Sequence, residues 1–219
     1  MNTNYIQKTQ ITPRIIFMTC LTAFALALTV SLPQAAHAYP KIEVPPVPST
    51  LQPPEGHEAF LVGHAVGTQQ YFCKYSNAGF AWTQFGPQAT LLRKKGKAFM
   101  THFQSSNPDE DPDYQIETGK ARPTWQNSHD ASAVWGALVP GAVFSPSPDA
   151  IPWLLLEIVG NQPGPFGGNA LGRATFIQRL NTTGGLAPAT GCTAEGDIGK
   201  KVLVPYTADY FFYHAPGVK

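Results

Sequence analysis

Short runs of alternating apolar and polar residues recur along most of the chain, and they predict strands rather than helices. The first runs lie at 59–66, 70–75 and 80–85, with Gly67-Thr68 and Asn77-Ala78-Gly79 as the expected turns. Runs at 89–92 and 98–103 flank Arg93-Lys94-Lys95-Gly96-Lys97, which predicts a hairpin with a solvated basic tip. Further runs follow at 133–139, 151–159, 174–180, 201–204 and 206–213. The pattern predicts an all-β fold, a single antiparallel sandwich or barrel of about 8–10 short strands.

Two segments interrupt this rhythm. Residues 39–56 contain prolines at 40, 45, 46, 48, 53 and 54, which exclude a helix and favour an extended arm. This arm is either a flexible spacer or packed across the domain, and the packed arm is favoured by apolar Ile42, Val44, Val47 and Leu51. Residues 104–123 lose the alternation, and the polar stretch 107–113 predicts a loop.

The N-terminus has the three parts of a secretory signal. Lys8 and Arg14 precede an apolar run at 15–30, and Ala36-His37-Ala38 predicts cleavage before Tyr39. An uncleaved anchor is the rival interpretation, but the run is shorter than the roughly 20 residues that span a bilayer. We therefore expect a signal peptide at 1–38, the Pro-rich arm at 39–56 and one β-rich domain at 57–215. The expected location is secreted or periplasmic, with no membrane span after cleavage.

Composition narrows the choice of partner. Without the leader the chain holds 13 basic and 14 acidic residues, so it has no general electrostatic attraction to nucleic acid. Hydrophobic residues make up 43% of the sequence, which is enough to build a core. The partner expected for such a domain is a ligand outside the cell or in the envelope.

The cysteine count changes once the leader is removed. Cys20 leaves with it, and Cys73 and Cys192 remain. A lone pair in an oxidising compartment usually forms a disulfide, which here would link the first third of the domain to its last part. The alternative is two buried thiols or one nucleophile.

Metal binding has weak support. Asp109, Asp111 and Asp113 alternate like the first ligands of a calcium loop, but Tyr114 and Lys120 stand where an EF-hand needs Gly and Glu. A solvated loop is the favoured interpretation, with an irregular calcium site as the alternative. The histidines are scattered without ligand spacing, so no metal or other cofactor is expected.

Candidate catalytic groups are dispersed. His129, Asp130 and Ser132 are the residue types of an acyl-transfer triad, but neighbours on a strand point to opposite faces, so Asp130 and Ser132 more readily close a turn. Asp209 lies in an apolar segment and needs a partner if buried, for which Arg179 is the natural candidate. A structural Arg179–Asp209 ion pair is favoured over a catalytic one.

Aromatic residues offer a binding surface. Trp82, Trp135 and Trp153 lie within apolar runs and are expected in the core. Trp125 follows Pro123 and is expected in a Pro-rich loop, so it is the tryptophan expected to be exposed and to contact a ligand.

Several strings, taken in order, resemble one family. The most specific are Phe176-Ile177-Gln178-Arg179-Leu180-Asn181-Thr182-Thr183-Gly184-Gly185 and Val204-Pro205-Tyr206-Thr207-Ala208-Asp209-Tyr210-Phe211-Phe212-Tyr213. Over residues 45–214 the chain resembles the secreted bacterial and fungal family of the domain of unknown function 3455. The resemblance implies export, one domain and a paired cysteine, and it supplies no activity. The chain departs from the family between Thr101-His102-Phe103 and Asp130-Ala131-Ser132, where extra residues intervene and Ala131 replaces Gly.

Two function classes remain. The favoured one is a non-catalytic ligand- or surface-binding β domain, because no catalytic constellation is complete. The alternative is a cofactor-free hydrolase-type enzyme that uses the polar residues of one cleft, with His102, Asp130, Arg179 and Asp209 as the residues to test. Convergence of these side chains in one pocket would favour the enzyme.

Overall fold

The computed structural model describes residues 41–110 and 120–218. The signal peptide expected at 1–38 lies outside these ranges, as do Asp111 and Asp113 of the acidic loop. Within them, no helix has the length and apolar character that crossing a membrane requires.

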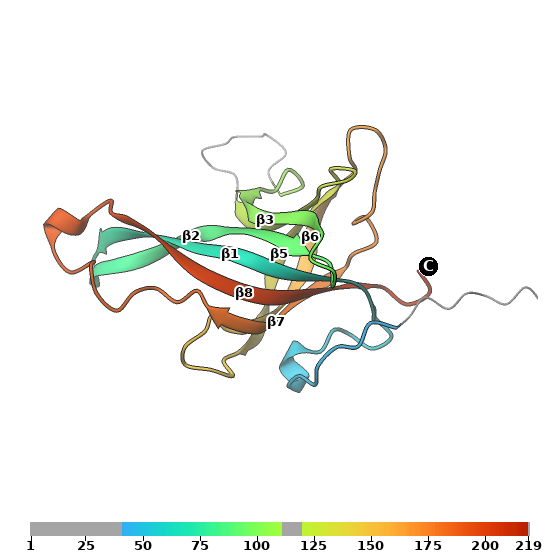
Figure 1. Ribbon diagram of the computed structural model, residues 1–219, viewed down its shortest axis with the longest axis horizontal. Helices are drawn as coiled ribbons and strands as arrows, with labels where there is room; N and C mark the ends of the chain where they lie inside the picture. The colour runs from blue at the N-terminus through green and yellow to red at the C-terminus, as the bar shows by residue number, and fades with distance from the viewer. Residues whose placement is uncertain (1–40, 111–119, 219) are drawn as a thin grey trace, which may run out of the picture. The chain divides into compact units, whose positions relative to one another are not determined.

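Eight antiparallel strands form a closed barrel (Figure 1). Each strand pairs with the next along the chain, and the last pairs with the first. The strands are β1 (Glu58–Ser76), β2 (Gly79–Leu92), β3 (Ala98–Ser106), β4 (Ala121–Asn127), β5 (Ala133–Phe144), β6 (Trp153–Gln162), β7 (Phe176–Gly184) and β8 (Lys201–His214). Two single-turn 3-10 helices, η1 (Ser49–Leu51) and η2 (Glu195–Asp197), complete the described elements. The all-β prediction is confirmed, and of its two alternatives the chain adopts the barrel.

Several predicted strands merge into longer ones. Gly67-Thr68 is not a turn, because β1 runs through it and Gly67 pairs with Ala89 of β2. A Cβ atom on Gly67 would lie 2.2 Å from the carbonyl oxygen of Gln88, so this glycine permits a close approach of two strands. The hairpin at 93–97 forms as predicted, closed by a bond from the Arg93 amide to the Lys97 carbonyl.

The barrel interior is packed with side chains from alternate positions of every strand. Its fully buried members include Leu91, Met100, Ile177 and Phe212. An eight-stranded barrel has room for such a filling or for one small ligand. The interior therefore supplies most of the apolar core.

A second apolar cluster lies outside the barrel wall, beneath the Pro-rich arm. Leu51 is fully buried against Phe211, Leu180 and Tyr213, and the Gln178 amide donates to the Leu51 carbonyl at 2.5 Å. Further arm residues that pack on this cluster are Ile42, Val44 and Val47. The packed arm is confirmed, and the flexible spacer is not.

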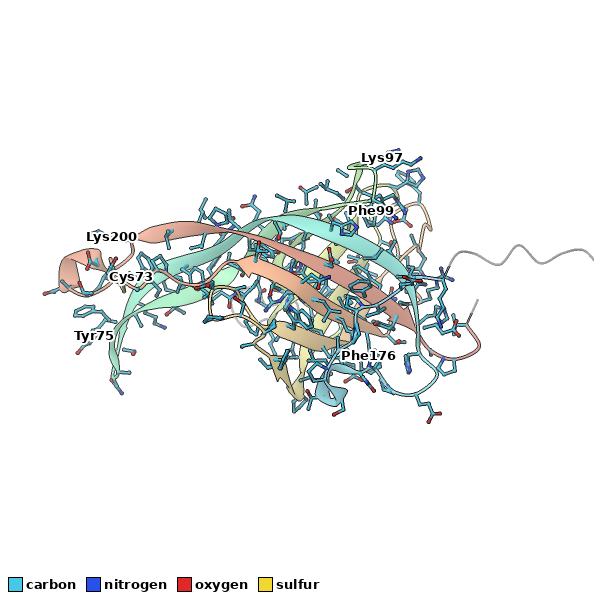
Figure 2. The ribbon with its side chains drawn as sticks, turned by 60° about the horizontal axis from the view of Figure 1, so that its bottom comes forward. Cys73, Tyr75, Lys97, Phe99, Phe176 and Lys200 are labelled. Carbon is cyan, nitrogen blue, oxygen red and sulfur yellow. A yellow bond between two sulfur atoms is a disulfide. The ribbon has the colours of Figure 1, made fainter. Side chains whose placement is uncertain are left out.

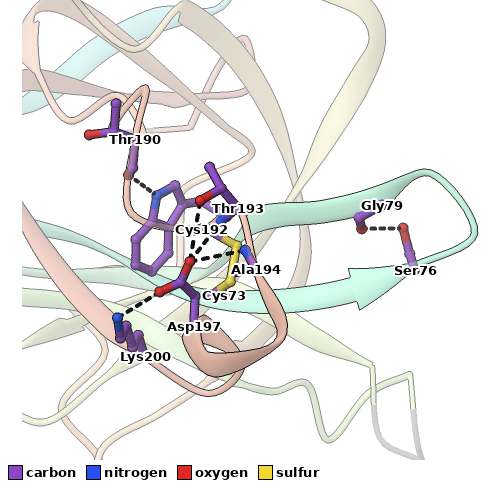
Figure 3. The surroundings of a disulfide bond; sticks show 10 residues. Cys73, Ser76, Gly79, Thr190, Cys192, Thr193, Ala194, Asp197 and Lys200 are labelled. Atoms are coloured by element: carbon purple, nitrogen blue, oxygen red, sulfur yellow. Dashed lines mark hydrogen bonds and ion pairs between the residues drawn. A yellow bond between two sulfur atoms is a disulfide. The ribbon is translucent and has the colours of Figure 1, made fainter.

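Strands β1, β2 and β8 continue past β3 and β7 as a three-stranded extension of residues 69–76, 79–88 and 201–205 (Figure 1). Figure 2 shows Cys73 and Tyr75 in this extension, with Lys200 directly before its β8 strand, far from Lys97 at the other end. Cys73 and Cys192 form the predicted disulfide, with Cα atoms 5.4 Å apart. The disulfide attaches the segment 186–200 to one side of the extension (Figure 3). The Trp82 indole donates to the Thr190 carbonyl at 2.9 Å and holds the same segment.

Candidate functional site

Three rings of the barrel interior stack at one level. The His102 imidazole lies on the Trp125 indole with ring centres 4.2 Å apart and planes 10° from parallel. Tyr210 meets both rings edge-on, with its centre 4.9 Å from His102 and 5.4 Å from Trp125. All three side chains are at most 3% exposed. The predicted exposure of Trp125 is therefore wrong: the residue lies in β4, which the sequence analysis took for a loop, and it points inward opposite His102.

His102 is a neutral hydrogen-bonding group. Its Nδ1–H donates to the Thr124 carbonyl at 2.9 Å, which leaves Nε2 as an acceptor. Burial lowers the pKa of His102 to about 3, against a smaller opposing effect of the bond to Thr124. The imidazole is therefore uncharged at neutral pH and a weak base.

Arg179 brings a positive charge to the same interior. Ile177 is buried inside the barrel while Gln178 and Leu180 contact the arm side, so the alternation of β7 turns Arg179 inward. Its Nε and Nη2 atoms donate to the Pro152 carbonyl at 3.0 and 2.8 Å. Arg179 is absent from the three ion pairs found among the described residues, which are His64–Asp209, Arg122–Glu110 and Lys200–Asp197.

The Arg179 charge affects the pKa values of the surrounding tyrosine side chains. Burial raises the pKa of Tyr71, Tyr206 and Tyr210, and the nearby guanidinium opposes this rise in each case. The Tyr206 and Tyr210 hydroxyls lie 3.4 Å apart, and the Tyr71 hydroxyl donates to the Gly185 carbonyl at 2.6 Å. Arg179 therefore stands among neutral aromatic groups.

Two buried donors near this group have no partner among the described residues, the Nε2 amide of Gln69 and the Nε1 of Trp125. Gln69 accepts a bond from the Gln84 amide at 2.5 Å, which leaves its own amide unused. Gly185 packs closely against Tyr206, Ile151 and Gln69. A Cβ atom added at Gly185 would lie within 3.2 Å of a side-chain atom of each of these residues. We call the following residues the interior cluster: Gln69, His102, Trp125, Arg179, Tyr206 and Tyr210.

Asp209 does not belong to the interior cluster. The register pairs Arg179 with Tyr210, and Leu180 with Asp209, so Asp209 points to the outer side. Its carboxylate accepts from His64 Nδ1 at 2.6 Å and from the Asn181 amide at 2.8 Å. The predicted Arg179–Asp209 ion pair is therefore wrong, because the two residues lie on opposite faces of the same sheet.

Asp130 closes a turn, in line with the structural interpretation of the sequence. Its carboxylate accepts from the Ser132 hydroxyl at 2.7 Å, from the Ser132 amide at 3.0 Å and from the Ala170 amide at 2.8 Å. The side chain thus ties the β4–β5 turn to the segment before β7. His102, Asp130, Arg179 and Asp209 occupy three separate places, and only His102 and Arg179 share one.

The acidic segment has a structural contact at its described end. One Asp109 oxygen accepts from the Asn161 amide at 3.1 Å. Among residues 41–110 and 120–218, no group of three or more histidine, cysteine or acidic side chains is placed to hold a metal ion. Asp111 and Asp113 lie outside these ranges.

An open depression of about 720 Å³ lies near the C-terminal end of the described chain. Arg173, Thr175 and Val218 are among its lining residues. The Arg173 guanidinium lies over the Phe60 ring, 4.3 Å from its centre. Like the interior cluster, this depression therefore places an arginine where an anion could bind.

Sequence reasoning missed one member of the interior cluster. Gln69 stands between Ala65 and Tyr71 at the inward positions of β1, and it is fully buried. The signal that could have identified Gln69 is a polar residue at an inward position of a strand. It was missed because the turn expected at Gly67-Thr68 divided β1 into two runs, and Gln69 lay outside both.

Comparison with protein families gives one match. Residues 53–214 match the family described as "Protein of unknown function (DUF3455)". No curated protein and no solved structure matches the chain.

Proposed function

The chain belongs to the DUF3455 family of proteins of unknown function, and on that premise we propose that it is a non-catalytic binding protein whose barrel holds a small organic anion beside Arg179. The site is the interior cluster, and the ligand is a carboxylate carried on an aromatic or short aliphatic group. The disulfide and the signal-like N-terminus support a secreted or periplasmic location, where the ligand is met.

The observation that carries the proposal is the Arg179 cation, for which the described chain supplies no acidic partner. Arg179 is partly buried, and a charge with reduced access to water is stabilised by an opposite charge and by hydrogen bonds. The Pro152 carbonyl satisfies two Arg179 atoms, but it brings no negative charge. A carboxylate matches a guanidinium in charge and in the spacing of its two oxygens.

The unpaired groups of the interior cluster favour the same ligand. Both buried atoms without a described partner, on Gln69 and Trp125, are N–H donors. Unpaired donors require an acceptor, and a carboxylate has two oxygens that only accept. The Trp125 and Tyr210 rings offer an apolar wall to the rest of the ligand.

The ligand reaches this cluster through the β5–β6 connection. Ile151 and Gly185 lie over Gln69 and Tyr206, so the connection at 145–152 has to move for the ligand to enter. The first part of this connection, residues 145–149, is mostly exposed, whereas Ala150 and Ile151 are buried and the Ile151 amide donates to the Gly184 carbonyl. The Thr182 hydroxyl also donates to the Ile151 carbonyl at 2.6 Å, and Arg179 donates to the Pro152 carbonyl, so opening of the connection breaks these bonds.

Binding is favoured over hydrolysis because the polar candidates do not converge. His102, with a pKa of about 3, is a poor general base at neutral pH. Asp130 and Asp209 are held by their own partners in other places. A cofactor-free hydrolase would need such groups within hydrogen-bond distance of one another.

The test is a thermal-shift titration of the purified, disulfide-bonded protein at constant ionic strength. Benzoate, hexanoate, phosphate and sulfate serve as probes, and a ligand at 100 times its Kd adds about 2.7 kcal/mol to stability. For a domain of this size that is a rise in Tm of roughly 5–10 °C. We expect the rise with a carboxylate, and its loss in Arg179→Met.

Arg173→Met is the matched control, since Arg173 also touches an aromatic ring but lies in the open depression. A shift that survives Arg179→Met and disappears in Arg173→Met would place the site in the depression and contradict the proposal. The same holds if none of the carboxylates changes the Tm of the unmodified protein. A response to phosphate or sulfate alone would contradict the carboxylate assignment.

A further inference from the structure

The outer side of the extension and of the adjoining barrel wall carries a patch without charge. Side chains of β8, β1 and β2 lie there in cross-strand rows, because their neighbours Tyr206, Ala65 and Ala89 point inward. One row runs Thr207–Val66–Thr90, and the next runs Pro205–Thr68–Gln88. We call the following residues the neutral face: Val66, Thr68, Gln70, Phe85, Gln88, Thr90, Leu203, Pro205 and Thr207.

The neutral face exposes large apolar groups. Phe85 is 65% exposed, Leu203 58% and Val66 55%. Phe85 also meets Phe72 edge-on, with ring centres 6.5 Å apart. A contiguous exposed apolar patch on a sheet is the usual mark of an interaction surface.

The chain covers two other groups of apolar side chains, while Leu138, Val143 and Phe144 of β5 stay 47%, 44% and 40% exposed. The arm buries Phe211, Leu180 and Tyr213 until each is at most 5% exposed. The segment 186–200 covers the inner side of the extension through Cys192 and Thr190. No described segment covers the neutral face.

We propose that the neutral face packs against the neutral face of a second copy of this chain. The two copies are related by a two-fold axis that lies between the sheets and runs across the strands near Thr68. In such a contact each residue meets its own counterpart or a near neighbour. A charge at the centre would therefore meet a like charge, and the central rows contain none.

The charges at the two ends of the face fit this axis. Lys201 lies at one end of the β8 stretch, and Asp209 lies at the other on the same outer side. A two-fold axis across the strands reverses their direction, so Lys201 of each copy comes near Asp209 of its partner. An axis along the strands would keep both Lys201 side chains at one end and both Asp209 side chains at the other, so the opposite charges would not meet.

The expected complex is a modest one. The neutral face has fewer side chains than the 20–30 residues per partner of a standard interface. We therefore expect a dimer that dissociates on dilution, in the micromolar range of Kd.

The test is sedimentation velocity of the full disulfide-bonded protein over a concentration series. We expect a concentration-dependent dimer that Leu203→Lys weakens at least tenfold. The control is Phe166→Lys, because Phe166 is 99% exposed and lies in the β6–β7 connection, outside the neutral face. A protein that stays monomeric at millimolar concentration would overturn the proposal, and so would a dimer that both substitutions weaken equally.

A charge reversal tests the axis itself. Lys201→Glu should weaken the dimer, while Lys97→Glu, on the hairpin at the opposite end, should leave it unchanged (Figure 2). A dimer that Lys201→Glu strengthens would overturn the axis. If the protein is monomeric but a neutral polysaccharide resin retains it through Leu203, the face is a glycan site and the second copy is excluded.

Discussion

Leu51 offers the sharpest test of the arm. Its side chain is fully buried between the arm and the outer wall of the barrel, against Phe211 and Leu180. Its carbonyl accepts from Gln178, and this bond remains when the side chain is shortened. Leu51→Ala therefore removes packing and leaves the backbone contact in place.

The size of the effect follows from the burial. Replacing a buried leucine by alanine costs about 2.7–5 kcal/mol, least where the surroundings can close on the space. The arm is a single chain segment that can settle toward the barrel, so we expect about 3 kcal/mol. For a domain of this size the Tm would fall by roughly 6–12 °C.

Urea unfolding and a thermal scan measure this loss, and limited proteolysis locates it. Leu51→Ala should also make residues 41–56 more accessible to protease, because Leu51 is the fully buried contact of the arm. Leu186→Ala is the control, since Leu186 is 39% exposed and should change stability by no more than about 0.5 kcal/mol. A loss below about 1 kcal/mol for Leu51→Ala would refute the reasoning and make the arm a spacer.

Three further predictions concern the folded chain. The Cys73→Ala/Cys192→Ala variant should lose up to about 5 kcal/mol in urea unfolding, because the bond closes a loop over a separation of 119 residues; equal midpoints for the variant and the oxidised protein would rule this out. Because the pKa of His102 is about 3 when folded, the unfolded chain binds its proton first as the pH falls. Protonation of His102 therefore does not affect the free energy of unfolding above about pH 6.5. Below that pH it lowers this free energy by about 1.4 kcal/mol per pH unit, down to about pH 3. His102→Phe should flatten the stability between pH 6.5 and 5, and an unchanged slope would contradict the burial. Asp130→Ala should cost about 1–3 kcal/mol in thermal unfolding, since it leaves donors of Ser132 and Ala170 unpaired; a neutral result would show that water replaces the carboxylate.

The fold was largely readable from the sequence because strand alternation is a local property. The hairpin at 93–97 and the strands around it needed only period-two patterning and turn residues. Gly67 was misread as a turn because its reason lies elsewhere in the chain, in the close approach of Gln88. β4 was missed because only its pairing with β3 reveals that Trp125 points inward.

The site was less readable, because it depends on which strands become neighbours. Arg179 and His102 were named from the sequence, but their common location follows from barrel closure. The partner of Asp209 was misjudged for the same reason: β1 pairs with β8, and this pairing brings His64 rather than Arg179 to the carboxylate. Cys73 and Cys192 were the exception, because a lone pair of cysteines has one possible disulfide.

The pairing of β1 with β8 also determines the order in which the chain can fold. Glu58 pairs with His214, so the barrel closes only after the last strand is present. The seven other strand pairings join consecutive strands and can form earlier. Pairing β1 with β8 closes the longest loop in the domain and therefore has the largest cost in loop-closure entropy. High contact order of this kind slows folding and leaves two unpaired edges on the incomplete sheet. A chain that stops before Lys201 would keep both edges open and would be expected to aggregate.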